Sequence, residues 1–391
     1  MLKKSVVALV LVAMLLTPAL AAPLKASNDA PSRMLLGQDD LPTSPLACPG
    51  EEEAMEEPAA TEEAEEAEEV MEYNGGQPVD APDLAGQDIR VLDLPKLIGI
   101  AYFAATTRGL NEAAEELGNM EIVTDAPTEA SVDDQITFIE NYVTQGIDVI
   151  AFASNDPVAI SPALRNALEQ GVHVVGFDAD SEPDAREWFV NQATFNGMAK
   201  ALVDSMVEEV GEDGSVAIIT SSLTAPNQNR WISEMLAYAD KCYPDLNWLE
   251  TVPSEEDQQL AFQRAQELVN KYGEDLDGIF AMSSVAGPGA ADALTQMGVC
   301  DQTITVGIST PNQMRPFIEN GCAPKVVLWN PIDLGYATAY VIRAVIDGEL
   351  QPGATEVEAG RLGTLPVING SEILLGPPTV FTQENIADFD F

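Results

Sequence analysis

From about residue 90 onward, short apolar runs alternate with longer segments in which apolar residues recur every three or four positions. The short runs predict buried strands. The longer segments predict amphipathic helices, such as one over 107–117 whose apolar positions share a face. Strands and helices that alternate in this way require parallel strands joined by right-handed crossovers. The sequence therefore predicts an α/β fold.

The alternation runs through the chain twice. Strands are predicted over 97–103, 120–124, 149–153 and 172–177, and a second series over 216–220, 246–252, 278–282, 304–308 and 325–329. A helix over 191–210 separates the two series. We expect two tandem doubly wound parallel-sheet lobes joined by hinge crossings. The predicted boundaries are 88–178 plus 331–350 for lobe 1 and 179–330 plus 351–391 for lobe 2.

The first 87 residues lack this alternation. Residues 1–22 combine Lys3 and Lys4, an apolar run and a small-residue ending, which is typical of an export signal peptide. Residues 23–87 are rich in Pro, Ala and Glu, so they cannot bury enough apolar surface to offset their ordering entropy, and a disordered acidic linker is expected. These features predict a secreted or periplasmic protein at the cell-envelope exterior. An uncleaved signal would tether it to the membrane at its N-terminus.

The charge balance restricts the partners. The chain of 391 residues has 64 acidic and 18 basic side chains, a formal net charge of −46. A field of that sign repels phosphate backbones, so no nucleic acid partner is expected. Two explanations of the acidity stay open: general solubility, or adaptation to a salty exterior where screening relieves the self-repulsion. We expect a monomer.

Four cysteines lie in a chain that is expected to reach an oxidising compartment. Cys300 precedes the strand predicted over 304–308, and Cys322 ends the helix that follows. Both should lie at the same end of one β-α unit, so a disulfide between them is expected, with two idle thiols as the alternative. Cys48 lies in the run Leu46-Ala47-Cys48, which weakly resembles a lipoprotein acylation site. No apolar run precedes it, so lipidation is not expected.

No motif for catalysis, for a metal or for a cofactor is present. The single histidine, His173, lies inside an apolar strand, and no Cys or His pair has zinc spacing. No phosphate-binding glycine loop follows a predicted strand. We therefore expect no catalytic residue, no metal and no cofactor. A secreted carbohydrate-active enzyme is the less favoured alternative, since Asp178 and Asp180 are its only nearby pair of carboxylates.

Residues suited to a hydroxyl-rich ligand follow the predicted strands. In α/β sheets, ligands bind beyond the carboxyl ends of the strands. Asp178 closes one strand and could accept hydrogen bonds from two hydroxyls, while Asn227 and Gln228 each offer a donor and an acceptor. Each of these could instead cap a helix. Trp231 and Trp329 could pack on a sugar face, although such aromatic side chains are more often part of a core.

Several runs resemble the type I periplasmic sugar-binding proteins that feed ABC importers, from about residue 90 to the C-terminus. Two branches share these runs. The runs LPKLIG (94–99), PTE (127–129) and STPNQMRP (309–316) resemble the autoinducer-2-binding branch. The runs SNDP (154–157), NQN (227–229), WNPIDLGY (329–336) and EVEAGR (356–361) resemble rhamnose-binding proteins.

The resemblance implies a receptor that captures a small sugar or polyol between its lobes and delivers it to the permease of an ABC importer. It favours a rhamnose-like deoxyhexose. Autoinducer-2 is the alternative, since Lys96, Asp178 and Gln228 match that pattern. Asn227, Met282 and Ser284 depart from it. Asn330 would lie at a hinge crossing. The expected ligand-binding residues are Lys96, Phe103, Asp178, Asn227, Gln228, Met282, Ser284, Ser309 and Asn330.

Overall fold

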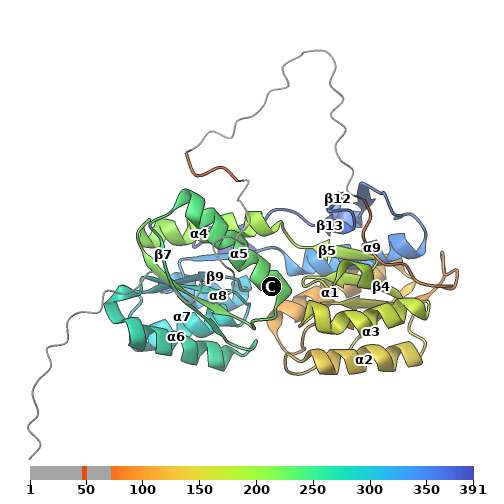
Figure 1. The fold of residues 1–391 in the computed structure, drawn as a ribbon, viewed down its shortest axis with the longest axis horizontal. Coiled ribbons are helices and arrows are strands. Elements are labelled where there is room, and N and C mark those ends of the chain that lie inside the picture. Colours follow the sequence, from red (N-terminus) through yellow and green to blue (C-terminus); the bar gives the residue numbers. More distant parts are fainter. Residues whose placement is uncertain (1–45, 51–71) are drawn as a thin grey trace, which may run out of the picture.

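The computed structural model describes residues 46–50 and 72–391, which form two α/β lobes lying side by side (Figure 1). This is the predicted fold class. The sheet of lobe 1 has the strand order β11-β12-β13-β5-β4-β3-β1-β2, and that of lobe 2 has the order β14-β10-β9-β8-β6-β7. Strands β1 to β5 pair in parallel, as do β6 to β10, whereas β11, β12 and β14 pair antiparallel with their neighbours.

The bounds of the elements are as follows. Lobe 1 contains β1 (Ile89–Leu94), α1 (Ala101–Leu117), β2 (Met120–Thr124), α2 (Val132–Thr144), β3 (Val149–Phe152), α3 (Pro157–Glu169), β4 (His173–Phe177), β5 (Trp188–Asn191), α9 (Pro331–Ile346), β11 (Glu356–Glu358), β12 (Thr364–Ile368) and β13 (Glu372–Leu374). Lobe 2 contains α4 (Phe195–Val210), β6 (Ser215–Thr220), α5 (Pro226–Cys242), β7 (Asn247–Pro253), α6 (Gln258–Tyr272), β8 (Gly278–Ala281), α7 (Ala286–Met297), β9 (Ile304–Gly307), α8 (Pro311–Glu319), β10 (Lys325–Leu328) and β14 (Thr379–Phe381).

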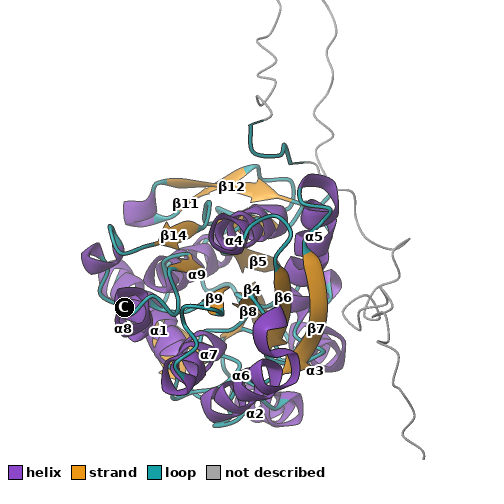
Figure 2. Ribbon diagram, turned by 90° about the vertical axis from the view of Figure 1, so that its left-hand side faces the viewer, coloured by secondary structure: helices purple, strands orange, loops and turns teal. Residues whose placement is uncertain are grey.

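Helices cover both faces of each sheet, and Figure 2 shows strands enclosed by helices when the molecule is viewed along its long axis. Successive strand residues point to opposite faces. In β1, Val91 packs in the core shared with α1 and α9, whereas Leu92 packs with α2 and α3. All four residues of β3 are buried, as expected of a central parallel strand. The carboxyl ends of the strands in the two lobes face each other.

The lobe boundaries differ from those predicted. Strand β5 pairs with β4 and β13, and β11 to β13 extend the same sheet, so residues 179–191 and 356–374 belong to lobe 1 rather than to lobe 2. In the predicted tail of lobe 2, only β14 joins the lobe 2 sheet. The chain therefore crosses between the lobes after β5, after β10 and after β13. Strand β5 has only four residues and α4 begins shortly after it. Its apolar residues therefore could not be distinguished in the sequence from those of the helix, and the strand was not predicted.

The first predicted strand, over 97–103, is also wrong. The strand lies at Ile89–Leu94, and α1 already begins at Ala101. The apolar run crosses from a loop into the first helical turn, and a short apolar run does not distinguish strand from helix. As a consequence, the side chains that follow β1 lie at its carboxyl end, and Phe103 lies on a helix.

The linker prediction is wrong for its last part. Residues 1–45 and 51–71 lie outside the described residues, and with them the predicted signal peptide and most of the linker. Residues 72–87 pack along lobe 1, where the backbone of Val79 donates to Leu168 O (2.8 Å). The ring of Tyr73 packs against Trp188 and its hydroxyl donates to Glu187 O (2.9 Å). One aromatic side chain and backbone hydrogen bonds order this stretch despite its composition.

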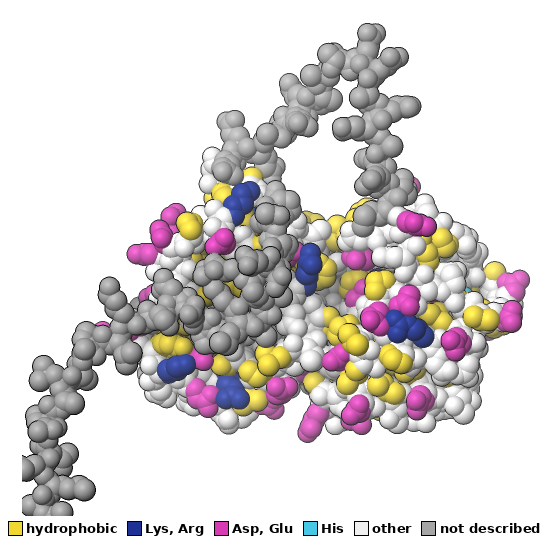
Figure 3. Space-filling view, in the orientation of Figure 1, with side chains coloured by type: hydrophobic (Ala, Val, Ile, Leu, Met, Phe, Trp, Pro, Cys, Tyr) yellow, Lys and Arg dark blue, Asp and Glu magenta, His cyan; other side chains and the backbone are white. Residues whose placement is uncertain are grey.

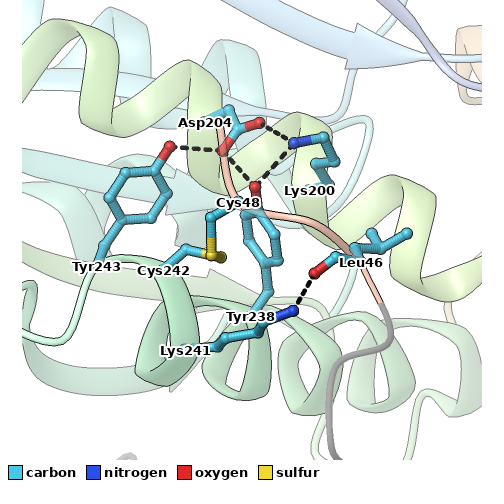
Figure 4. Close-up of a disulfide and its surroundings, with 8 residues drawn as sticks. All are labelled: Leu46, Cys48, Lys200, Asp204, Tyr238, Lys241, Cys242 and Tyr243. Carbon is cyan, nitrogen blue, oxygen red and sulfur yellow. Dashed lines mark hydrogen bonds and ion pairs between the residues drawn. A yellow bond between two sulfur atoms is a disulfide. The ribbon is translucent and has the colours of Figure 1, made fainter. Parts of the chain in front are cut away.

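Two disulfides are present, and together they pair all four cysteines of the chain. Cys300 is bonded to Cys322, the expected pair. Cys48 is bonded to Cys242 at the end of α5, a pairing that the sequence analysis did not predict. Figure 4 shows this disulfide beside Lys241, whose ammonium donates to Leu46 O (2.5 Å). The chain near residue 48 is thus held against lobe 2, whereas residues 72–87 lie on lobe 1.

Acidic side chains are spread over both lobes on the face seen in Figure 3. The high acidity is therefore a property of the folded body as well as of the Glu-rich segment. Among the described helices, none is both long enough and apolar enough to cross a membrane.

Candidate functional site

A cavity lies between the lobes, beyond the carboxyl ends of the strands of both sheets. It encloses an empty volume of about 340 Å³, part of which is open to solvent. Lobe 1 lines it with Lys96, Ile100, Tyr102, Phe103 and Asp178, and lobe 2 lines it with Asn227, Gln228, Trp231, Glu256, Met282, Ser283, Ser284, Ile308 and Trp329.

Most of the residues that the sequence singled out meet at this cavity. Those that line it are Lys96, Phe103, Asp178, Asn227, Gln228, Met282 and Ser284. Two predicted residues do not line it. The hydroxyl of Ser309 donates to Ser284 O (2.7 Å), so it supports the wall from behind. The side chain of Asn330 caps α9 by accepting from the backbone of Ile332 (3.0 Å). The structure thus places these two residues outside the lining, where their side chains bond to protein groups.

Asp178 follows β4 and is 4% exposed. Its φ of 61° lies in the left-handed region, which non-glycine residues seldom occupy and which often marks functional sites. The hydroxyl of Tyr102 donates to Asp178 Oδ1 (2.8 Å), and Trp329 Nε1 donates in turn to the Tyr102 oxygen (3.0 Å). Burial raises the pKa of the Asp178 carboxyl to about 6, against the opposing effect of Lys96. The carboxylate is thus held in one orientation by a chain of donors that reaches into lobe 2.

Lys96 connects the lobes. It lies in the loop between β1 and α1, is 3% exposed, and its ammonium donates to Asn227 Oδ1 (3.3 Å). The same ammonium lies 3.9 Å from Glu256 Oε1. Asn155 fixes the loop by donating to Lys96 O (2.9 Å). A buried cation needs such partners, because an unpaired charge in a low-dielectric environment is costly.

The two amides predicted on the lobe 2 side lie in the first turn of α5. Gln228 Oε1 accepts from Thr220 Oγ1 (2.8 Å) and from the backbone of Ser221 (2.7 Å), which fixes the amide orientation. Its Nε2 then points toward Glu256 Oε1 (3.5 Å) and the cavity. Asn227 Nδ2 lies 3.4 Å from Asp178 O on the opposite lobe. The oxygens of both amides are thus bound to protein groups, Asn227 Nδ2 donates to the opposite lobe, and Gln228 Nε2 is directed toward the cavity.

Aromatic rings form one wall of the cavity. The ring centroids of Tyr102 and Trp329 are 5.9 Å apart, and those of Trp231 and Trp329 are 5.7 Å apart. Phe103 packs edge-on against Tyr102 at 5.1 Å. Such a surface can pack on the C–H face of a sugar ring.

The sequence analysis did not single out five of the lining residues, which are Ile100, Tyr102, Glu256, Ser283 and Ile308. Tyr102 was missed because the sequence analysis predicted a strand over 97–103. A helix that begins at Ala101 places Tyr102 beside Phe103 at the carboxyl end of β1. Glu256 belongs to the acidic run at 255–257, which looks like a solvated loop. Its position just after β7 was the only available signal.

Within residues 46–50 and 72–391, no group of three or more His, Cys, Asp and Glu side chains comes together in the way a metal ion requires. The cavity combines two carboxylates, one ammonium, amides and aromatic faces. Groups of these kinds bind hydroxyls and pack on sugar rings.

Comparisons with known proteins agree with this geometry. The family model described as "Periplasmic binding protein domain" matches residues 94–350. A solute-binding protein of an ABC transporter from Clostridium phytofermentas, solved with bound L-rhamnose, is 30% identical. It has a TM-score of 0.72, and the match covers 78% of this chain and 98% of that one.

Two further relatives have lower sequence identity to this chain. LsrB from Clostridium saccharobutylicum, solved in complex with AI-2, is 24% identical with a TM-score of 0.73, covering 78% of this chain and all of that one (100%). A xylitol-binding protein from Mycolicibacterium smegmatis is 22% identical over 274 residues, which is 68% of this chain and 70% of the relative. The chain belongs to the periplasmic binding protein family, within the type I sugar-binding proteins of ABC transporters.

Proposed function

We propose that this protein is an extracytoplasmic receptor that captures a small sugar, a rhamnose-like deoxyhexose in the first instance, and delivers it to the permease of an ABC importer. The observation that carries the proposal is the meeting of buried polar side chains from both lobes around one cavity. Lys96 and Asp178 come from lobe 1, and Asn227 and Gln228 come from lobe 2. The receptor acts as a monomer.

Binding and closure are coupled in this proposal. Only the closed arrangement lets one ligand contact both lobes, so the ligand stabilises that arrangement over an open one. The three crossings between the lobes are the hinges. The permease then recognises the closed form, and contact with it releases the sugar.

A deoxyhexose suits the mixed character of the walls. Hydroxyls pair with Asp178 and with the amides of α5, while a methyl group can lie against apolar residues such as Met282 and Ile308. The relative at 30% identity, which was solved with L-rhamnose, supports this choice. Autoinducer-2 is the second candidate, since Lys96, Asp178 and Gln228 match the pattern of proteins that bind it.

A thermal-shift screen of the chain with both disulfides intact tests the proposal. The panel contains L-rhamnose, ribose, arabinose, allose, xylitol and autoinducer-2. A ligand at 100 times its Kd stabilises the native state by about 2.7 kcal/mol and so raises the midpoint. Small-angle scattering should show compaction with the same ligand. No shift with any compound of the panel, from a protein whose circular dichroism shows it folded, would contradict the proposal.

A pair of neighbouring asparagines provides the matched variants. Asn227→Ala removes an amide that lines the cavity, and the shift should be lost. Asn229→Ala, two residues further along α5, removes an amide that only contacts Leu223 O on the surface, so the shift should persist. Equal loss in both variants would indicate damage to the helix rather than to the site.

A further inference from the structure

We infer that Glu256 is a ligand-binding residue of the cavity and that, together with Asp178, it restricts the ligand to neutral sugars, excluding sugar acids and sugar phosphates. The inference rests on the proposed function, that the cavity binds a sugar. It adds one contact residue from lobe 2 and the physical reason why anionic sugars are excluded.

The position of Glu256 is that of a site residue rather than of a surface acid. Its side chain is 8% exposed and lines the cavity. Its carboxylate lies 3.5 Å from Gln228 Nε2 and 3.9 Å from Lys96 Nζ. It therefore faces one predicted binding residue on each lobe, opposite Asp178.

The backbone of the turn directs this side chain inward. Glu255 and Glu256 have φ values of 50° and 53°, so two consecutive non-glycine residues occupy the left-handed region. Such conformations persist only where the surroundings impose them. Hydrogen bonds from the backbone of Ser254 to Thr220 O (2.8 Å) and from Glu255 N to Ser221 O (2.6 Å) hold the turn against the end of β6. As a result Glu255 is exposed to solvent while Glu256 faces the cavity.

A second feature of the wall points to a ligand. Trp231 is 2% exposed and lines the cavity, yet its Nε1 has no hydrogen-bond partner among the described residues. Buried donors are almost always paired. A sugar oxygen in the cavity would accept this bond, just as sugar hydroxyls would donate to the two carboxylates.

The formal charges of the lining residues set the ligand class. Asp178 and Glu256 are negative, and Lys96 is the single cation of the lining, so the wall has an excess of one negative charge. Like charges repel more strongly in a buried site than in water. An anionic ligand would add a third negative group against one ammonium, whereas the hydroxyls of a neutral sugar can donate to both carboxylates.

Titration calorimetry at pH 7.5 with two matched ligands tests the inference. The ligands are the neutral sugar with the largest thermal shift, L-rhamnose in the first instance, and the uronic acid with the same ring configuration, which keeps the ring and adds a carboxylate. The native protein should bind the acid at least about 100-fold more weakly, as expected when a buried charge meets no partner. Glu256→Gln should weaken binding of the neutral sugar roughly tenfold and narrow the ratio of the two Kd values.

Glu255→Gln is the control, because it removes the same charge from the neighbouring, exposed position of the same turn. It should change neither Kd. If the native protein binds a sugar but Glu256→Gln leaves both Kd values as they were, or if the acid binds as tightly as the sugar, the inference is overturned while the receptor function stands. If no sugar binds at all, the proposed function itself fails.

Discussion

Two buried aspartates of lobe 1, Asp93 and Asp178, differ in one respect that decides their roles. Both belong to the same sheet region, on β1 and just after β4, and both are almost fully buried. Burial raises the pKa of each to about 6. Asp93 Oδ2 accepts from Thr107 Oγ1 (2.6 Å) and Thr124 Oγ1 (3.0 Å), inside the lobe. Asp178 instead faces lobe 2 across the cavity.

The comparison shows that a buried carboxyl with a raised pKa does not by itself mark a binding site. Asp93 lies within its strand, where neighbouring strands and α1 enclose the side chain. Asp178 lies one residue beyond its strand, where the backbone turns. Lys96 of the same lobe and the amides of the other lobe line the cavity with it. What distinguishes them is the cavity and the charges around it.

The largest expected effect separates the two residues directly. Asp178→Asn should raise the Kd for the sugar at least about 100-fold, because hydrogen bonds to a charged group are worth about 1.5–3 kcal/mol each. Asp93→Asn should leave the Kd within roughly twofold, since its partners are internal hydroxyls and no ligand bond is lost. Titration calorimetry at pH 7.5 measures both. Equal losses would mean that Asp93 acts on the site through the sheet.

Removing the donor that holds Asp178 should have a smaller effect. Tyr102→Phe takes away the hydrogen bond to Asp178 Oδ1 and the acceptor of Trp329 Nε1, so the affinity should fall about tenfold. Tyr340→Phe is the matched control, since it removes a hydroxyl from lobe 1 outside the cavity lining. An unchanged Kd in Tyr102→Phe would show that the Asp178 carboxylate does not depend on this donor for its position.

The smallest expected effect concerns stability and pH. Burial raises the pKa of Asp93 in the folded state to about 6, above the ordinary aspartate pKa of 3.8, so the folded state holds the proton more tightly than the unfolded state. The stability from this group is therefore full below pH 3.8 and is lost as the pH rises through 6. Between pH 5 and 7.5 this loss is about 1 kcal/mol.

Asp93→Asn should remove that contribution, so the free energy of unfolding should fall less between pH 5 and 7.5 than in the native protein. Urea unfolding without ligand measures the difference. If the free energy of unfolding fell by the same amount between pH 5 and 7.5 in both proteins, the raised pKa would not belong to Asp93.

Much of the fold was predictable because its signals are local. The periods of 2 and 3.6 residues, the glycines that end helices and the apolar runs of central strands are all contained within short windows of sequence. Helix α1, for example, ends at Gly118, whose φ of 78° needs the freedom of glycine. Asp178, Asn227 and Gln228 were found by the same reasoning, since each follows a strand or opens a helix, whereas Lys96 was found through the family resemblance.

Other features were not predictable from local patterns. The pairing of β13 with β5 joins residues such as Ile373 and Val190, which are far apart in the chain. The sequence therefore could not show to which lobe the segment 351–391 belongs. The acidic run around Glu256 looks like solvated loop whether or not it faces a cavity. Cys48 and Cys242 are separated by 194 positions, and no spacing rule connects them.

The sequence by itself determined that this chain forms two α/β lobes and that polar side chains collect where strands end, because hydrophobic period and strand position are local properties. Only the tertiary structure decided which strands belong to which lobe, that Tyr102 and Trp329 hold Asp178, and that Glu256 faces Lys96 across the cavity. Those contacts join segments more than 70 residues apart, from Asp178 to Tyr102 at the nearest. They form only when both sheets have folded and the lobes have met.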